Sequence, residues 1–363
     1  MVLFVANTLA QLMNAVVIKQ RFYTNDKCDL YYKPVYHDIA FRMKEIGVFN
    51  NIFESPSFGL TTRGKSFIKN GVRRIRTVIY MKQLRRSFPT DPMQYKKVLL
   101  SSDLLRILEI YYVAKRINRE VELYLYEEGM LEYNVLHKRR PWYESFFSKV
   151  FFQHFFLEEC IGLYVYRPEY VRNEKWHNIK IYEIGTIDND IRRVLNYVFN
   201  VNTSIKYLEK YRFVYLDQTF PAMEDALQRE LVFQLRKVID ENDMAIKLHP
   251  RSNKNKYSGY FNLIEDQIPF ELICLGEAIE DLCFLTIYSS AVLALKMSLN
   301  SSCKVVFLIK ALNQMKAKGC PTNMSENDEL ILRLIADIKK DNKNTVFIPD
   351  SLDDLHDLLI KLQ

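Results

Sequence analysis

Residues 211–217 read YRFVYLD, a short run of apolar and aromatic residues that ends on an aspartate. Such a run is typical of a strand that is buried on both faces of a sheet. A helical stretch follows at about 222–240, and a second apolar run, AIKLHP at 245–250, follows the helix. Because two parallel strands need a crossover connection, usually a helix, this order predicts a βαβ unit.

The same alternation runs through the whole chain in two blocks. The first block contains VLFVAN at 2–7, a helix at about 8–19, KKVLLSS at 96–102, DLLRILEIYYVAKRI at 103–117 and VELYLY at 121–126. The second block begins with the βαβ unit at 211–250. It continues with FELICLG at 270–276, LTIYSS at 285–290, AVLALKM at 291–297, CKVVFLI at 303–309, a helix at about 326–340, TVFIPD at 345–350 and a last helix from Ser351. The predicted fold class is therefore α/β, with two Rossmann-like, doubly wound domains facing a cleft.

The polar stretch at 185–206 separates the two blocks, so we expect one domain over residues 1–205 and another over 206–363. A chain of 363 residues is long enough for two domains of ordinary size. We expect the last helix to pack back on the first domain.

The composition is that of a globular protein rather than a disordered one, with 48% hydrophobic and 26% charged residues. The opening MVLFVANTLAQLMNAV lacks a basic leader, and the sequence contains no apolar run of about 20 residues, so neither a signal peptide nor a membrane helix is expected. The six cysteines show no C-x-x-C spacing, which favours free thiols in a reducing cytoplasm over a zinc site.

A basic segment at 63–88 contributes much of the net charge of +7. Its apolar residues fall near helical spacing, so one interpretation is a solvated helix face. The alternative is a contact with an anionic substrate or with the anionic inner face of the cell membrane, which would make the protein peripheral there. Nucleic acid is disfavoured as a partner, because no helix-turn-helix, zinc-finger or aromatic RNA-binding pattern occurs. The sequence leaves open whether the chain forms a homodimer.

Polar residues capable of chemistry stand just after several predicted strands, at the sheet edge where α/β proteins bind ligands. Glu127 and Glu128 precede Gly129, and two adjacent carboxylates beside a tight turn suit a general base, although such a pair is more often a solvated turn. His249, Pro250 and Arg251 combine a titratable ring, a rigid turn and a guanidinium suited to phosphate.

Two further stretches suit the nucleotide side of a site. Ser289 and Ser290 stand between a predicted strand and a helix, where serines either cap the helix or bind a phosphate together with free N–H groups. Glu271 follows Pro269 at the opening of the predicted strand FELICLG, and its carboxylate could hold ribose hydroxyls.

The tripeptide Asp188-Asn189-Asp190 has the D-x-D form that binds a divalent metal in one class of sugar transferases. It follows no convincing strand, and Asp188 can instead cap the helix DIRRVLNYVF, so no metal site is predicted. Gly-rich phosphate loops and the H-E-x-x-H and G-x-S-x-G motifs are absent, which removes support for kinases, metalloproteases and serine hydrolases.

Taken together, YEEGMLEY, KLHPRS and YSSA resemble, in this order, the acidic-acidic-Gly, His-Pro and Ser-rich motifs of bacterial sialyltransferases of glycosyltransferase family 52, which include lipooligosaccharide and capsule enzymes. The opening ANTLAQLMNAV is similar to the first strand and helix of that family. The resemblance implies the two-Rossmann GT-B architecture. It also implies that Thr8 and Gln11 lie on the acceptor side. Because three of the four candidate stretches lie after residue 245, we expect CMP to bind in the cleft, mostly to the C-terminal domain.

The activity implied is an inverting transfer of sialic acid from CMP-sialic acid to a sugar hydroxyl of a bacterial surface glycan. His249 would protonate or hydrogen-bond the leaving phosphate, while Ser289 and Ser290 bind its oxygens. Pro250 and Arg251 would shape the nucleotide side. No cofactor or metal is expected, because the donor leaves with a single phosphate.

Three carboxylates remain open as the base that takes the proton from the acceptor hydroxyl. Relatives of the family use the acidic-acidic-Gly motif, which here offers Glu128, slightly preferred, and Glu127. Within family 52 the base is an aspartate shortly after the first strand of the second domain, and Asp217 is the nearest match. The rival hypotheses are a transferase for another nucleotide sugar and a non-catalytic binding protein on the same scaffold.

Overall fold

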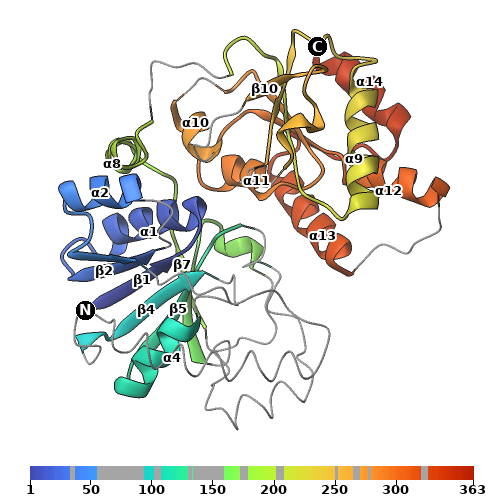
Figure 1. The fold of residues 1–363 in the computed structure, drawn as a ribbon. Coiled ribbons are helices and arrows are strands. Elements are labelled where there is room, and N and C mark those ends of the chain that lie inside the picture. Colours follow the sequence, from blue (N-terminus) through green and yellow to red (C-terminus); the bar gives the residue numbers. More distant parts are fainter. Residues whose placement is uncertain are drawn as a thin grey trace. The chain divides into compact units, whose positions relative to one another are not determined.

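The structure is a computed structural model, and it describes residues 1–32, 37–54, 94–101, 108–129, 133, 159–171, 179–201, 208–249, 252–264, 270–276, 279–319 and 326–363. The chain divides into two compact units, Met1–Asn200 and Val201–Gln363 (Figure 1). The basic segment 63–88 lies outside the described residues, as do Pro250 and Arg251.

The first unit is built on a seven-stranded sheet with the order β3-β2-β1-β4-β5-β6-β7, in which all neighbouring strands are parallel. The strands are β1 (Val2–Ala6), β2 (Cys28–Tyr32), β3 (Asn51–Glu54), β4 (Lys97–Ser101), β5 (Glu122–Tyr126), β6 (Cys160–Val165) and β7 (Lys180–Glu183). The helices are α1 (Leu9–Phe22), α2 (His37–Glu45), α4 (Leu108–Ile117) and α8 (Asn189–Phe199). A short 3₁₀ helix, Pro168–Tyr170, follows β6.

The order of this sheet reverses between β1 and β4, which pair in register from Val2 opposite Lys97. From β1 the chain winds outward through α1 to β2 and on to β3, and it then returns to place β4 on the other side of β1. At such a switch point the loops after the two strands separate, and the opening at their carboxyl ends is where α/β proteins bind ligands. In Figure 1, α1 and α2 lie on one side of this sheet and α4 on the other.

The second unit repeats the plan with a six-stranded parallel sheet of order β10-β9-β8-β11-β12-β13. Its strands are β8 (Phe213–Leu216), β9 (Met244–Lys247), β10 (Asn262–Ile264), β11 (Cys283–Thr286), β12 (Lys304–Phe307) and β13 (Val346–Phe347). Its helices are α9 (Ala222–Leu235), α10 (Phe270–Gly276), α11 (Ser290–Met297), α12 (Ile309–Gly319), α13 (Glu326–Asp341) and α14 (Leu352–Leu362), with a 3₁₀ turn at Lys254–Lys256. The switch point of this sheet lies between β8 and β11.

The core of the second unit is formed by apolar residues of the central strands together with the inner faces of α9, α12 and α14. Phe213, Tyr215 and Leu285 lie in it fully buried, which explains why β8 and β11 read as nearly continuous apolar runs. Leu355 and Leu359 give α14 a buried face within this same core. The apolar side of the last helix therefore packs in the core of the second unit.

The stretch FELICLG is a helix, α10, and not the strand predicted from the sequence. The cause is that Phe270, Leu272, Ile273 and Leu275 are all buried, so the run is apolar all round and its periodicity does not distinguish a buried helix from a buried strand. The edge strand beside β9 is instead β10. It is three residues long and only partly buried, so its sequence gives almost no apolar signal.

A glycine in β6 allows three tyrosines to pack on one face of the first sheet. A Cβ atom on Gly162 would lie 2.5 Å from the ring of Tyr124 and 3.0 Å from that of Tyr182. Tyr182 stacks on Tyr164 with ring centroids 4.6 Å apart. Any larger residue at position 162 would therefore push these rings apart.

Within the described residues, no helix is long and apolar enough to cross a membrane. The described cysteines, five in number, are free and buried.

Candidate functional site

At the switch point of the first unit, the carboxylate of Glu128 is held by side chains from two other elements. Glu128 follows β5, Thr8 caps the N-terminus of α1, Gln11 lies in the first turn of that helix, and Ser101 ends β4. Thr8 Oγ1 donates to Glu128 Oε1 at 2.9 Å, while Gln11 Nε2 at 2.5 Å and Ser101 Oγ at 2.8 Å donate to Oε2. Thr8, Gln11 and Glu128 lie in the same unit, and the structure brings them into direct contact.

The donors around Glu128 are themselves oriented. Gln11 Oε1 accepts the Asn7 N–H at 2.6 Å, and Gln11 Nε2 also lies 2.7 Å from Ser101 Oγ. This fixes the orientation of the Gln11 amide, so that its N–H groups face the carboxylate. The N-terminus of α1 adds a partial positive charge beside the carboxylate.

Glu128 keeps an open acceptor position. An ionised carboxylate offers about four acceptor positions, and in the part of the chain that the structure describes three donors occupy Glu128, one of them on Oε1. The residue is partly exposed. It can therefore accept a proton from a hydroxyl that approaches from solvent.

Glu127 faces a different environment from its neighbour. Its side chain is buried and accepts hydrogen bonds from the hydroxyl of Tyr133 at 2.5 Å and from the N–H of Tyr166 at 2.8 Å. Its carbonyl oxygen accepts from Asn14 Nδ2 at 2.6 Å, and Tyr166 in turn donates to Asn14 Oδ1 at 2.9 Å. Glu127 thus ties the end of β5 to α1 and to the chain after β6. Its buried carboxylate stabilises the fold here and does not face solvent.

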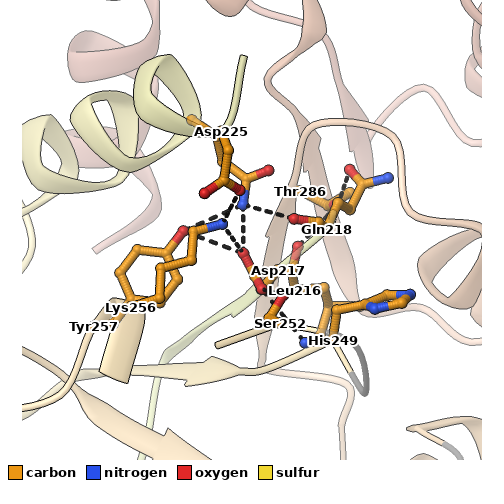
Figure 2. A network of polar contacts seen from close by, with 10 residues as sticks. Leu216, Asp217, Gln218, Asp225, His249, Ser252, Lys256, Tyr257 and Thr286 are labelled. Carbon is orange, nitrogen blue, oxygen red and sulfur yellow. Dashed lines mark hydrogen bonds and ion pairs between the residues drawn. The ribbon is translucent and has the colours of Figure 1, made fainter. Parts of the chain in front are cut away.

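At the switch point of the second unit, Asp217 follows β8 and is surrounded by donors (Figure 2). On Oδ1 it accepts from Lys256 Nζ at 2.9 Å, from the Tyr257 hydroxyl at 3.2 Å and from Gln228 Nε2. On Oδ2 it accepts from the Ser252 hydroxyl and, at 3.5 Å, from the backbone N–H of His249. Five donors thus bind its two oxygens. Its side chain has 0% exposure, so neither oxygen contacts solvent.

Lys256 links this aspartate to α9. Its ammonium lies 2.7 Å from Asp225 as well as 2.9 Å from Asp217, and its side chain is only 6% exposed. Burial, and then the negative charge of Asp217, raise the pKa of the nearby Tyr257 hydroxyl, which therefore stays protonated as a donor.

His249 follows β9 by two residues and is half-buried. Its carbonyl oxygen accepts the Ser252 N–H at 2.8 Å. In Figure 2 its ring extends away from the Asp217 carboxylate. The ring is thus directed outward from the buried network, while the backbone is held by it.

Ser289 caps α11, as one of the two interpretations of the sequence expects. Its Oγ accepts the Ala291 N–H at 3.3 Å, and its own N–H donates to Thr286 Oγ1 at 3.0 Å. Gln218 Oε1 accepts the neighbouring Tyr288 N–H at 2.9 Å, which ties the end of β8 to the end of β11. Ser290 is the first residue of α11 and is exposed, so its hydroxyl is accessible to a ligand at this helix N-terminus.

Glu271 lies in the first turn of α10 and is half-buried. Burial raises the pKa of its carboxyl group, and the charge of Lys247 opposes the shift. Because FELICLG is a helix, Glu271 reaches its place from a helix N-terminus and not from a strand.

Asp188 caps α8, as expected for a structural residue, by accepting the N–H groups of Asp190 and Ile191 at 3.0 Å each. It also pairs with Arg21 at 2.9 Å, and the Ile191 N–H, followed by Arg21, lowers the pKa of its carboxyl group. Across the described ranges, no group of three or more His, Cys, Asp or Glu residues could hold a metal ion.

Several residues of these clusters were missed from the sequence. Ser101 stands at the end of KKVLLSS and could have been found by the same strand-end rule that selected Glu128. Ser252 ends the stretch KLHPRS but was not selected as a site residue. Gln228, Lys256 and Tyr257 carry no motif, and only the fold brings them to Asp217.

No protein-family model matches the sequence, and no curated protein matches it. Solved structures do resemble the fold. The GT-B domain of a sialyltransferase from Photobacterium damselae superposes with a TM-score of 0.52 at 12% identity, covering 96% of this chain and 100% of that chain. The glycotransferase of kitacinnamycin and the spinosyn rhamnosyltransferase SpnG each give a TM-score of 0.53, at 11% and 9% identity, covering 99% of this chain and 90% of theirs. The fold class is thus that of GT-B glycosyltransferases, as predicted, while identities this low show the fold alone.

Proposed function

We propose that the chain is an inverting glycosyltransferase that moves sialic acid from CMP-sialic acid to a sugar hydroxyl of a bacterial surface glycan, lipooligosaccharide or capsule. The observation that carries the proposal is the partly exposed Glu128 carboxylate, oriented by Thr8, Gln11 and Ser101 at a switch point of the first sheet. The motif order that resembles family 52, and a fold shared with a sialyltransferase, support this donor.

Glu128 is the general base of this proposal. It takes the proton of the acceptor hydroxyl as the oxygen attacks the sialyl anomeric carbon and the bond to the CMP phosphate breaks. The open position on Oε1 favours it over Asp217, whose two oxygens accept five donors and have no exposure. Glu127, also buried and bonded to Tyr133 and Tyr166, keeps Glu128 in place.

The second unit supplies the leaving-group side. His249 donates a proton or a hydrogen bond to the departing phosphate, and Ser289, Ser290 and the N-terminus of α11 bind its oxygens as negative charge develops. Pro250 and Arg251 shape the nucleotide side, and Glu271 holds the ribose hydroxyls. The single phosphate of CMP needs no metal, so the transfer proceeds without a cofactor. The protein works in the cytoplasm, with the basic segment 63–88 in peripheral contact with the inner membrane face.

A second candidate is transfer of a different sugar, because a rhamnosyltransferase shares the fold as closely as the sialyltransferase does. The test is a screen of donor hydrolysis across CMP-, UDP- and GDP-sugars, with chromatography of the released nucleotide. Release of CMP from CMP-sialic acid alone supports the proposal. Release from another sugar nucleotide favours the second candidate, and CMP binding without any turnover would indicate a non-catalytic binding protein.

A further inference from the structure

Asp217 is buried too deeply for a base but is well placed to hold the chain around His249. The backbone of His249 and the side chain of Ser252 both reach one oxygen of its carboxylate. The His249 N–H approaches Oδ2 at 3.5 Å and the Ser252 hydroxyl donates to the same oxygen, while the Ser252 N–H donates to the His249 carbonyl at 2.8 Å. One carboxylate oxygen thus binds both His249 and Ser252 (Figure 2).

The other oxygen anchors the carboxylate itself. Gln228 of α9, Lys256 and Tyr257 all donate to Oδ1, and Lys256 also pairs with Asp225 of α9. A buried anion needs such a partner, since an unpaired charge inside a protein is strongly unfavourable. The Asp217 carboxylate is therefore held in place between α9 and the backbone of His249.

From this arrangement we propose that Asp217, held by Lys256, is a positioning residue that orients His249 for its role at the leaving phosphate. The inference rests on the proposed function of His249 and deepens it. It assigns to Asp217 a role other than that of the base which the resemblance implies. The positioning is geometric. The backbone N–H of His249 and the hydroxyl of Ser252 both bind one fixed oxygen, so the backbone from which the His249 ring extends is held in one place.

Ser252→Ala tests the proposal with little risk to the fold, because it removes one hydroxyl and leaves the ion pair of Asp217 with Lys256 intact. A hydrogen bond to a charged group corresponds to roughly a tenfold effect or somewhat more, so we expect kcat for sugar transfer to fall about tenfold with KM for the acceptor unchanged. Ser252→Thr, which keeps a hydroxyl, should restore most of the rate. Lys316→Met serves as the control, since the ion pair of Lys316 is with Glu224 of α9 at 3.3 Å and not with Asp217.

The decisive comparison is the same substitution in a His249→Ala background. If Ser252 and Asp217 act through the ring, Ser252→Ala has no further effect there, because no ring is left to misplace. A full additional tenfold loss in that background would overturn the proposal.

A readout without turnover separates this inference from the proposed function. In ¹H–¹³C spectra of the histidine rings, the His249 signal is identified by its loss in His249→Gln. It should shift or broaden in Ser252→Ala and stay in place in Ser252→Thr and Lys316→Met. An unmoved signal in Ser252→Ala would overturn the positioning role. A moved signal in a protein that turns over no nucleotide sugar would support positioning and refute only the proposed function.

Discussion

Replacing Lys256 by Met should destabilise the second unit much more than the loss of an ordinary surface lysine. The substitution keeps most of the side-chain length but removes an ammonium that is 6% exposed and bonded to a carboxylate of 0% exposure. Breaking a buried pair from one side costs about 3–5 kcal/mol, because the remaining charge stays buried without its counter-ion. Gln228, Ser252 and Tyr257 still donate to Asp217, so we expect the lower end, about 3 kcal/mol, or roughly a hundredfold change in the unfolding equilibrium.

The matched control for this prediction is Lys316→Met, whose ion pair with Glu224 is 18% and 34% exposed. Partly exposed pairs contribute about 0–1 kcal/mol, so this variant should stay close to wild type. Urea unfolding followed by circular dichroism gives the change in the free energy of unfolding. Hydrogen exchange of the β8 and β9 amides assigns that change to the second unit.

The double variant Lys256→Met with Asp217→Asn completes the test. Because the neutral amide no longer needs a counter-ion, the double variant should be less destabilised than the sum of the two single changes. Additive effects, or a loss in Lys256→Met no greater than in Lys316→Met, would refute the buried ion pair as the brace of this site.

Three further predictions address ligand, metal and pH. Millimolar CMP should raise the thermal midpoint of the protein by several degrees, since a ligand that binds only the native state stabilises it; a shift with UDP or GDP but none with CMP contradicts the sialyl donor. Sugar transfer should survive EDTA, because Asp188 caps α8 and pairs with Arg21. If EDTA abolishes transfer and manganese restores it, Asp188-Asn189-Asp190 is a metal site after all. Glu271→Gln should stabilise the protein near neutral pH, where ionising a carboxyl group whose pKa is raised by burial costs free energy only in the folded chain. That gain should vanish towards pH 4, below the pKa of about 4.3 of an unfolded glutamate, since both states are then protonated; a gain that is equal at all pH values argues against the raised pKa.

The central strands could be predicted from the sequence because each is buried on both faces and is a continuous apolar run, as in Phe213–Leu216. The edge elements could not. Residues 262–264 and 180–183 form strands that are largely exposed or only partly buried, and the periodicity of 270–276 fits helix and strand equally well. Sequence signals thus located the switch points, where the strands are most apolar, better than the sheet edges.

The candidate site was accessible to sequence reasoning only where its residues follow strands. Glu128 and His249 were selected by that rule, and Thr8 by the resemblance of the first helix. Of the partners that distinguish Glu128 from Asp217, Ser101 ends a strand and was within reach of the same rule. Lys256 and Gln228, which enclose Asp217, follow no strand and were not accessible. These partners lie 27, 39 and 11 residues from their carboxylates, and only the folded chain brings them together.

The most direct test of the account is the rate of sialyl transfer from CMP-sialic acid by Glu128→Gln, measured as CMP released in the presence of a lipooligosaccharide or capsule glycan that the wild-type protein accepts. The amide keeps the shape of the side chain but cannot take the acceptor proton, so kcat should fall by about 10²–10⁴-fold with KM for the donor nearly unchanged. Glu120→Gln, in the exposed turn before β5, should leave the rate at its wild-type value. Transfer by Glu128→Gln at the wild-type rate would contradict Glu128 as the base of this site.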